Sequence, residues 1–291
     1  MSWNQSGIAA AGNGSYGNAS NQLYSPQGFY VDSDYSIYVA DTYNHRVQQW
    51  LPNALDGITV AGVTGIPGSN DSLLYYPRVI HGDSQQNLYI GDSYGINVWL
   101  SGASTGSRIA SSNLGFGSIV GIYVDKNGYI YASYNWDCAV RMWTSANAAS
   151  VVVAGGNGCG YASFQLAYPN GLTVDSLTNT IYVANYNAHT IVAWPIGATN
   201  GTVVAGRNST YGTLDYLLYS PTDVKQDHYG NLYVADSNSR RIMLFCQNPP
   251  STSGRIIAGY RLSNPNRIAL DSDLNLYILT SNQIQKYPRT S

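Results

Sequence analysis

Charged residues are scarce in this chain of 291 residues. Asp, Glu, Lys and Arg make up only 10% of it, whereas roughly 25% is usual in a soluble protein. Lysine occurs three times, as Lys126, Lys225 and Lys286, and the formal net charge is −2. So few cations leave no basic stripe for a phosphate backbone, and we therefore do not expect nucleic-acid binding.

Long apolar runs are also missing. No window approaches the roughly 20 apolar residues of a membrane helix, so we expect no membrane insertion. The first residues, MSWNQSG, have neither the basic nor the apolar region of a secretory signal peptide. Earlier removal of a leader, or a longer parent chain, would be compatible with this beginning.

The chain lacks the short motifs of common enzymes and metal sites. Its three cysteines, Cys138, Cys159 and Cys246, have no Cys-x-x-Cys spacing, which argues against zinc. Neither a Gly-x-Ser-x-Gly elbow, nor a His-Glu-x-x-His pair, nor a phosphate-binding loop is present, and the four histidines are dispersed. We predict no catalytic residues, no protein-held metal and no cofactor, although enzyme activity stays an open question.

The residues that are abundant favour β-structure. The chain has 26 Tyr and 30 Gly, and 44% of its residues are hydrophobic. Apolar runs rich in Tyr, Val and Ile, separated by turn residues, are typical of all-β proteins.

Six copies of one sequence unit follow one another along the chain. They align on an Ile-Tyr or Leu-Tyr dipeptide, and an acidic residue precedes each tyrosine by about six positions. The tyrosines are Tyr38, Tyr89, Tyr131, Tyr182, Tyr233 and Tyr277; the acids are Asp32, Asp83, Asp125, Asp175, Asp227 and Asp271. Such a period predicts a repeat architecture.

Each unit holds four short β-type runs that are apolar on both faces, as in sheets sandwiched between neighbouring sheets. The sixth unit lacks its fourth run, but residues 7–17 match residues 201–212. We therefore predict a closed six-bladed β-propeller of four-stranded antiparallel blades, in which an N-terminal strand at 6–12 completes the last blade. Closure implies a single domain, residues 1–291, with blades at about 24–65, 75–112, 117–157, 167–208, 218–260 and 264–288.

These units resemble the NHL repeat family, and the resemblance covers essentially the whole chain. The pattern Pro-x-Gly-x-x-Val-Asp, followed by Tyr-Val-Ala-Asp and an Asn-x-Arg triplet, is clearest at residues 26–47 and, in part, 221–242, and the family's Asn-His-Leu reads Asn44-His45-Arg46 here. The second and third units lack the Asn-His pair. The resemblance implies a six-bladed propeller, and it leaves the function open because the family includes binding platforms, sensor domains and a lyase.

Positions at which the repeats disagree are the candidates for ligand binding. Residues at the start of the innermost strands should surround the central channel, where a polar, asymmetric rim would suit a small polar ligand or a partner's side chain. The rim residues are Gln27, Arg78, Asn170, Asp223, Asn266 and Arg267. The alternative is a hydrated channel with an Asp223–Arg267 ion pair. A channel cation such as calcium would need more carboxylates than Asp223 alone.

Aromatic residues that follow the second strand form another candidate surface. Tyr43, Tyr94, Trp136 and Tyr186 occupy these loops in the first four blades. Bare aromatic rings are costly to expose, so they predict either a platform for a protein or glycan, or packing over the blade ends.

Cysteines and sequons favour an extracellular or cell-surface location. In propellers of this kind the loops of Cys138 and Cys159 share one face of the third blade, so we predict a disulfide between them and a free Cys246. Six Asn-x-Ser/Thr sequons, candidate glycosylation sites, occur at Asn4, Asn13, Asn18, Asn70, Asn200 and Asn208.

The functional prediction is a monomeric, non-catalytic binding or scaffolding propeller. Its ligand, a protein, a glycan or a small polar molecule, would meet the face that carries the rim. Two alternatives remain, a metal-dependent lyase or hydrolase of the propeller type and an RNA-binding module.

Overall fold

The computed structural model describes residues 2–111, 117–145, 148–247, 250–258 and 262–290. The chain forms two compact units, one of residues 1–114 with 269–291 and one of residues 115–268. Their elements are given below for each unit in turn. The single-domain prediction is not tested by this division.

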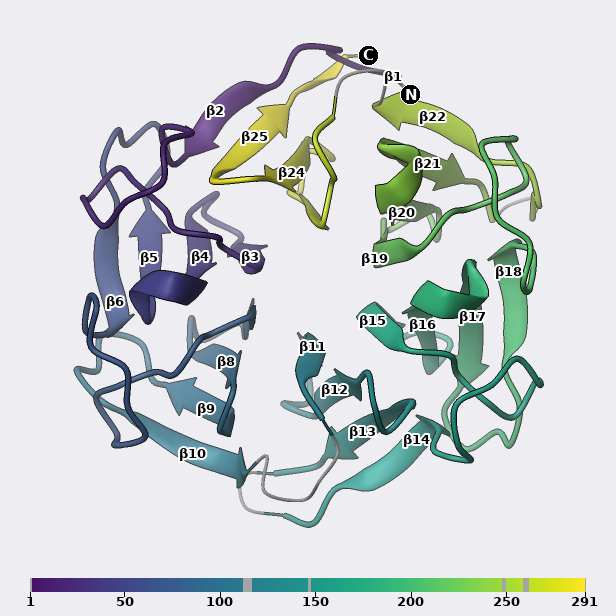
Figure 1. Ribbon diagram of the computed structural model, residues 1–291, viewed down its shortest axis with the longest axis horizontal. Helices are drawn as coiled ribbons and strands as arrows, with labels where there is room; N and C mark the ends of the chain where they lie inside the picture. The colour runs from purple at the N-terminus through teal and green to yellow at the C-terminus, as the bar shows by residue number, and fades with distance from the viewer. Residues whose placement is uncertain (1, 112–116, 146–147, 248–249, 259–261, 291) are drawn as a thin grey trace. The chain divides into compact units, whose positions relative to one another are not determined.

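Apart from one two-stranded pair described below, the described strands of the first unit lie in three antiparallel four-stranded sheets, which also include the beginning of β23 (Figure 1). The first sheet has β3 (Gly28–Val31), β4 (Ile37–Asp41), β5 (Arg46–Trp50) and β6 (Ile58–Gly62), in that order. The second sheet has β7 (Val79–Gly82), β8 (Leu88–Asp92), β9 (Gly95–Trp99) and β10 (Gly106–Ser111). The third sheet has β23 (Arg267–Leu270), β24 (Leu276–Thr280), β25 (Gln283–Tyr287) and β2 (Ile8–Ala11). A short 3-10 helix, η1 (Thr42–Asn44), joins β4 to β5.

The described part of the second unit repeats this arrangement in three further sheets. They consist of β11 (Ile119–Val124), β12 (Ile130–Tyr134), β13 (Ala139–Trp143) and β14 (Val151–Gly155); of β15 (Pro169–Asp175), β16 (Thr180–Asn185), β17 (Thr190–Pro195) and β18 (Thr202–Gly206); and of β19 (Pro221–Gln226), β20 (Leu232–Asp236), β21 (Arg241–Phe245) and β22 (Arg255–Ala258). The 3-10 helices η2 (Tyr186–Ala188) and η3 (Ser237–Ser239) follow β16 and β20.

The N-terminal strand completes the last sheet, as the sequence predicts. Strand β2 pairs with β25, with Ile8 opposite Lys286 and Ala11 opposite Ile284. The fold class is therefore confirmed as an all-β, six-bladed propeller of four-stranded antiparallel blades. An additional pair, β1 (Ser2–Trp3) with β26 (Arg289–Thr290), was not anticipated, and the buried Trp3 indole donates to the Leu274 carbonyl at 2.8 Å.

Parts of three predicted blades lie outside the described residues, namely residue 112 of the second blade, residues 146–147 of the third and residues 248–249 and 259–260 of the fifth. Among the described residues, no helix has the length and apolarity that a membrane span requires.

Apolar cores lie between neighbouring sheets, which explains why the strands are apolar on both faces. In the first unit, Val47 from β5 belongs to the same buried cluster as Ile90 and Trp99 of the next sheet. In the second unit, Val183 and Trp194 pack with Val140 of the preceding sheet. Burial of this kind removes apolar area from water on both sides of a strand and is the main source of stability.

A recurrent turn accounts for the acid that precedes the tyrosine by six positions in five of the repeats. Oδ1 of Asp32 accepts the backbone N–H groups of Asp34 and Ser36, and Oδ2 accepts the Tyr38 hydroxyl at 3.3 Å. Burial, followed by the adjacent Asp32 carboxylate, raises the pKa of Tyr38 to about 12. The tyrosine therefore stays protonated and keeps donating, which makes the pair part of the scaffold.

Glycine is required where the first strands of adjacent sheets approach one another. A Cβ at Gly28 would fall against the Arg78 carbonyl oxygen and 2.9 Å from Cα of Val79, and one at Gly171 would fall against Asp223. Because these neighbours are backbone atoms or buried side chains, they cannot swing aside.

Replacement of Gly28 by alanine should lower the free energy of unfolding by about 3 kcal/mol, because the added methyl overpacks two backbones. Urea denaturation at neutral pH measures the change. The matched control is Gly128→Ala, where φ is +78° but no atom lies within 4 Å, so that only the left-handed backbone should cost about 1 kcal/mol. Equal losses in the two variants would contradict the close-approach argument.

Candidate functional site

A buried acid or amide ends the second strand of four sheets and is used within the scaffold. Each accepts a backbone N–H from a residue 17 or 18 positions earlier in the chain. The pairs are Tyr24 to Asp41 at 2.7 Å, Tyr75 to Asp92 at 3.1 Å, Ala167 to Asn185 at 2.6 Å and Tyr219 to Asp236 at 2.6 Å. These side chains thus fasten the loop that enters their own sheet.

The first of these acids organises a larger cluster. Oδ2 of Asp41 accepts hydrogen bonds from Asn44 Nδ2 and Arg46 Nε, both at 2.8 Å. The Arg46 guanidinium also donates to the carbonyl oxygens of Ala19 and Gln22 at 3.0 and 3.1 Å. The cluster ties the loop before β3 to the turn after β4, and Arg241 with Asp236 does the same in the second unit.

His45 and His189 are structural acceptors in equivalent positions. Nδ1 of His45 accepts the Tyr76 N–H at 3.2 Å, and Nδ1 of His189 accepts the Ser220 N–H at 3.1 Å. Burial lowers the pKa of both imidazoles. Across the described residues, no three His, Cys, Asp or Glu side chains gather as a metal site would require.

Asp223 and Arg267, the charged rim residues of the second unit, are bonded to the protein itself. Asp223 Oδ1 forms a salt bridge with Lys225 Nζ at 3.0 Å, and its Oδ2 accepts the Ile268 N–H at 3.1 Å. The Arg267 guanidinium donates to the carbonyl oxygens of Thr222 at 2.8 Å and Val120 at 2.6 Å. Lys225, rather than Arg267, is therefore the salt-bridge partner of Asp223.

Arg267 reaches from β23 to β11, across 147 positions of sequence. Burial lowers its pKa, and the nearby Asp223 carboxylate opposes that effect. Because a guanidinium does not lose its proton in proteins, it stays a cation that needs acceptors, and backbone carbonyls supply them. A ligand at this place would have to compete with those bonds.

The remaining rim residues are partly buried. Gln27, Arg78, Asn170 and Asn266 occupy the positions at which the first strands begin. Among the described atoms, Arg78 Nε and Asn170 Oδ1 are buried without a hydrogen-bond partner. Asn170, Asp223, Asn266 and Arg267 belong to the second unit, and Gln27 and Arg78 to the first. Ligand binding by the rim stays a prediction.

Six tyrosines of the first unit form a continuous row, here called the tyrosine strip. Its members are Tyr16, Tyr24, Tyr43, Tyr76, Tyr75 and Tyr94, in the order of contact. Successive ring centroids lie 5.7, 5.1, 5.4, 4.8 and 4.8 Å apart; the first contact is tilted, the second and fifth are stacked, and the third and fourth are edge-on. The rings of Tyr16, Tyr43 and Tyr24 are 72%, 48% and 42% exposed.

The strip contains two of the four aromatic residues that the sequence singles out. Tyr43 and Tyr94 lie in it, joined through Tyr76 and Tyr75. Trp136, which is 72% exposed, and Tyr186, the first residue of η2, belong to the second unit.

Sequence reasoning missed the linking tyrosines, Tyr16, Tyr24, Tyr75 and Tyr76, which precede the first strands. Tyr24, Tyr75 and Tyr219 hold one equivalent position, each donating its N–H to a strand-end acid. The recurrence of tyrosine at this position is the sequence signal from which these residues could have been found.

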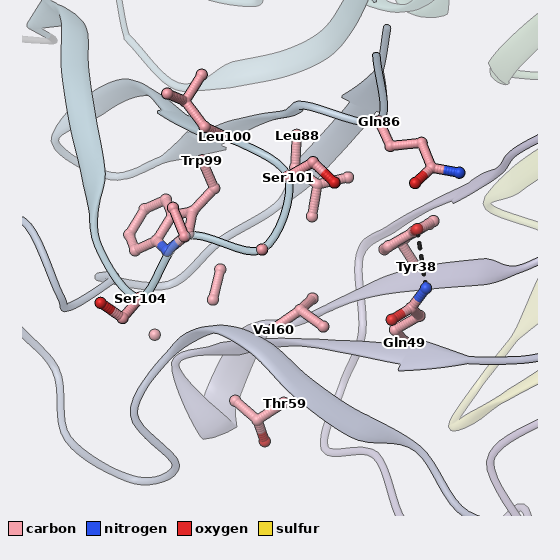
Figure 2. Close-up of a pocket in the computed structure, with 14 residues that line it drawn as sticks. Tyr38, Gln49, Thr59, Val60, Gln86, Leu88, Trp99, Leu100, Ser101 and Ser104 are labelled. Carbon is pink, nitrogen blue, oxygen red and sulfur yellow. Dashed lines mark hydrogen bonds between the residues drawn. The ribbon is translucent and has the colours of Figure 1, made fainter. Parts of the chain in front are cut away.

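Cavities between adjacent sheets follow the repeat. One of about 540 Å³ in the first unit lies between β6 and the turn after Trp99, and Figure 2 shows Gln49 donating to the Tyr38 hydroxyl at its wall, over 2.9 Å. A cavity of about 400 Å³ lies between β14 and the turn after Trp194 in the second unit. The same elements recur around both, so these spaces reflect the architecture.

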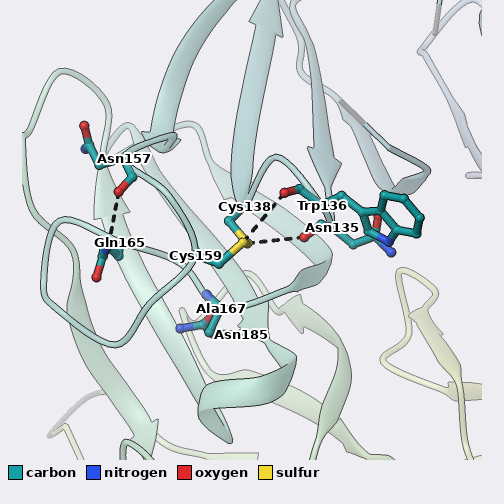
Figure 3. Close-up of a disulfide and its surroundings, with 8 residues drawn as sticks. All are labelled: Asn135, Trp136, Cys138, Asn157, Cys159, Gln165, Ala167 and Asn185. Carbon is teal, nitrogen blue, oxygen red and sulfur yellow. Dashed lines mark hydrogen bonds between the residues drawn. A yellow bond between two sulfur atoms is a disulfide. The ribbon is translucent and has the colours of Figure 1, made fainter. Parts of the chain in front are cut away.

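The predicted disulfide is present between Cys138 and Cys159 (Figure 3). It joins the turn after β12 to the loop after β14, and its sulfurs lie 3.3 and 3.6 Å from the carbonyl oxygens of Asn135 and Trp136. Cys246 is free and exposed. The asparagines of all six sequons are exposed.

These sheets and turns define the class of protein, a six-bladed β-propeller. Residues 23–50, which span β3 to β5, match the NHL repeat. The resemblance seen in the sequence is thereby confirmed, and this stretch contains both the Asp32–Tyr38 turn and the Asp41 cluster.

Solved structures with this fold are numerous, and three illustrate their range. A protein of unknown function from Bacteroides thetaiotaomicron has a TM-score of 0.74 at 13% identity, over 98% of this chain and 76% of the other. An auxiliary nutrient binding protein from Bacteroides ovatus has a TM-score of 0.69 at 12% identity, over 99% and 78%. Virginiamycin B lyase from Staphylococcus aureus has a TM-score of 0.60 at 14% identity, over 94% and 87%.

At these identities the likeness establishes the fold alone. No curated protein matches the chain.

His45 and His189, which accept backbone N–H groups, should make the fold less stable as the pH falls. Their pKa values lie below the ordinary value of about 6.5, so below that pH the unfolded chain binds more protons than the folded one. The free energy of unfolding, measured by urea denaturation, should therefore fall between pH 7.5 and pH 5.5.

The control is the double variant His45→Asn/His189→Asn, because asparagine tolerates the left-handed backbone of both positions and keeps an acceptor. It should lose most of this pH dependence. An unchanged slope in the double variant would show that other groups cause it.

Reduction of the Cys138–Cys159 bond should cost about 3 kcal/mol of stability, because the bond closes a loop with a sequence separation of 21. Thermal unfolding with and without a phosphine reductant measures the loss, and the variant Cys138→Ser/Cys159→Ser should reproduce it. Cys246→Ser is the matched control and should unfold like the wild type. A wild type insensitive to reductant would refute the prediction.

Proposed function

We propose that this protein is a non-catalytic binding module, located outside the cell or on its surface, whose ligand contacts the tyrosine strip. The observation that carries the proposal is the unbroken row of partly exposed rings in the first unit. A protein or a glycan is the class of ligand that such a surface suits.

Exposed tyrosines on this scale are unusual for a surface without a partner. Each ring offers a large apolar face and a polar hydroxyl at low conformational cost, which is why tyrosine is enriched at recognition surfaces. The strip is also held in place, because Asp41 accepts the Tyr24 N–H and His45 accepts the Tyr76 N–H. A preordered surface loses little entropy when it binds.

The rim residues support a small polar ligand less well. Asp223 and Arg267 are engaged by Lys225, Ile268 and backbone carbonyls, so that a ligand would have to displace internal bonds. The tyrosines need no such displacement.

Two further observations favour an extracellular setting and a binding role. The Cys138–Cys159 disulfide is of a kind that persists in oxidising compartments. One protein of the same fold is named for nutrient binding, which is consistent with a binding propeller.

The test compares the wild type with Tyr24→Ala/Tyr43→Ala on an array of purified glycans and a panel of extracellular matrix proteins. We expect a ligand that the wild type binds and that the double variant binds at least tenfold more weakly. Tyr229→Ala, which removes a ring that is 56% exposed in the second unit, is the control and should bind like the wild type. Equal binding by all three proteins, or no ligand for the wild type, would contradict the proposal.

A further inference from the structure

We infer that the ligand of the tyrosine strip is a neutral glycan chain, an inference that rests on the function proposed above. Three features of the strip point to this class of ligand: its length, its lack of charge and the polar groups beside it.

The strip suits an extended ligand better than a compact one. Five successive contacts, none longer than 5.7 Å between centroids, connect Tyr16 to Tyr94. Four segments contribute, namely the loop before β3, the turn after β4, the loop before β7 and the turn between β8 and β9. A glycan chain can place several of its sugar rings on such a row at once, and the contacts of these sugars then add within one binding event.

The strip is electrically neutral. Residues 12–28, 42–45, 72–77 and 93–95, which carry all six tyrosines, include no Asp, Glu, Lys or Arg. The nearby Asp41 and Arg46 are buried and paired with each other. Arg108, over the ring of Tyr94 at 5.2 Å, lies 4.0 Å from the Asp92 carboxylate.

Charge complementarity therefore excludes the polyanions. A nucleic acid or an acidic polysaccharide gains its affinity from contacts with several cations, which this surface lacks. An uncharged ligand avoids that requirement.

Exposed hydroxyl groups of the strip both donate and accept hydrogen bonds. Ser15 lies in the loop that carries Tyr16, and its hydroxyl, like the phenolic hydroxyls of the strip, can serve a sugar hydroxyl in either direction. A sugar ring has an apolar C–H face and a rim of hydroxyls. The tyrosine face and its phenolic edge, with the Ser15 hydroxyl, match both parts.

Tyr76 links the two ends of the strip. It precedes Pro77 with φ of 51°, and the equivalent residues before a proline in other repeats, Ser25, Tyr168, Ser220 and Asn264, have φ between 42° and 53°. This left-handed backbone therefore belongs to the repeat, and it accepts serine as well as tyrosine. Its ring bridges Tyr43 to Tyr75, so the strip would be interrupted without it.

The experiment measures binding of the full chain to laminarin, galactomannan and xylan as neutral probes, and to heparin and polygalacturonate as acidic probes. Affinity electrophoresis or calorimetry is carried out at about 0.05 M and again at about 0.5 M NaCl, because charge screening differs strongly between these two ionic strengths. At least one neutral polysaccharide should bind, with an affinity that salt changes less than twofold.

Tyr76→Ser is the sharpest variant, because serine already occupies this position in two repeats and the fold should tolerate it. We expect neutral-glycan binding to weaken about tenfold without a loss of thermal stability. Tyr43→Ala should weaken it similarly, and Tyr43→Phe, which keeps the ring, should restore most of it. Tyr229→Ala should bind like the wild type.

The outcomes separate this inference from the proposed function. Binding of a matrix protein that needs the strip, with no neutral glycan bound, would leave the proposed function standing and overturn the glycan. Salt-sensitive binding of heparin or polygalacturonate alone would also overturn it. Neutral-glycan binding that all strip variants retain would refute both, because the ligand would then lie elsewhere.

Discussion

The Asp41 carboxylate receives hydrogen bonds from the backbone of Tyr24, the amide of Asn44 and the guanidinium of Arg46. The loop before β3 depends on these bonds, since Arg46 and Asn44 also hold its carbonyl oxygens. Loss of the carboxylate would leave a buried guanidinium without its counter-charge, which is strongly unfavourable. The exposed rings of Tyr16 and Tyr24 are therefore positioned by a buried ion pair.

The same interaction recurs at Asp236 in the second unit, where Ser237 and Asn238 follow the strand-end acid. Tyr211 stacks there on Tyr219, and both rings contact the His189 imidazole, so that this group is shorter than the row of six tyrosines among the described residues of the first unit. Residues that recur in the repeats thus form the scaffold, and residues that differ between repeats determine which side chains are exposed on it. This division is common in repeat proteins, because every repeat packs against its neighbours in the same way.

Not every departure from the repeat is a binding feature. Asp223 and Arg267 stand where three other repeats have glycine, and the structure uses them internally, through Lys225 and the Val120 carbonyl. Sequence comparison between the repeats finds such positions, because a scaffold residue should be the same in every unit. It cannot show whether an exceptional residue faces a ligand or another strand, since that depends on the atoms opposite it.

Sequence alone determined the all-β class, the six units, the N-terminal strand of the last sheet and the pairing of Cys138 with Cys159. Each of these features follows from a local sequence pattern, because the repeat period tells which strand or loop of a blade the pattern belongs to. Tertiary structure alone decided that Tyr43 and Tyr94 belong to one continuous row. The tyrosines that join them, Tyr75 and Tyr76, come from the loop between two sheets, and their contacts arise only when the strand-end acids draw the loops together.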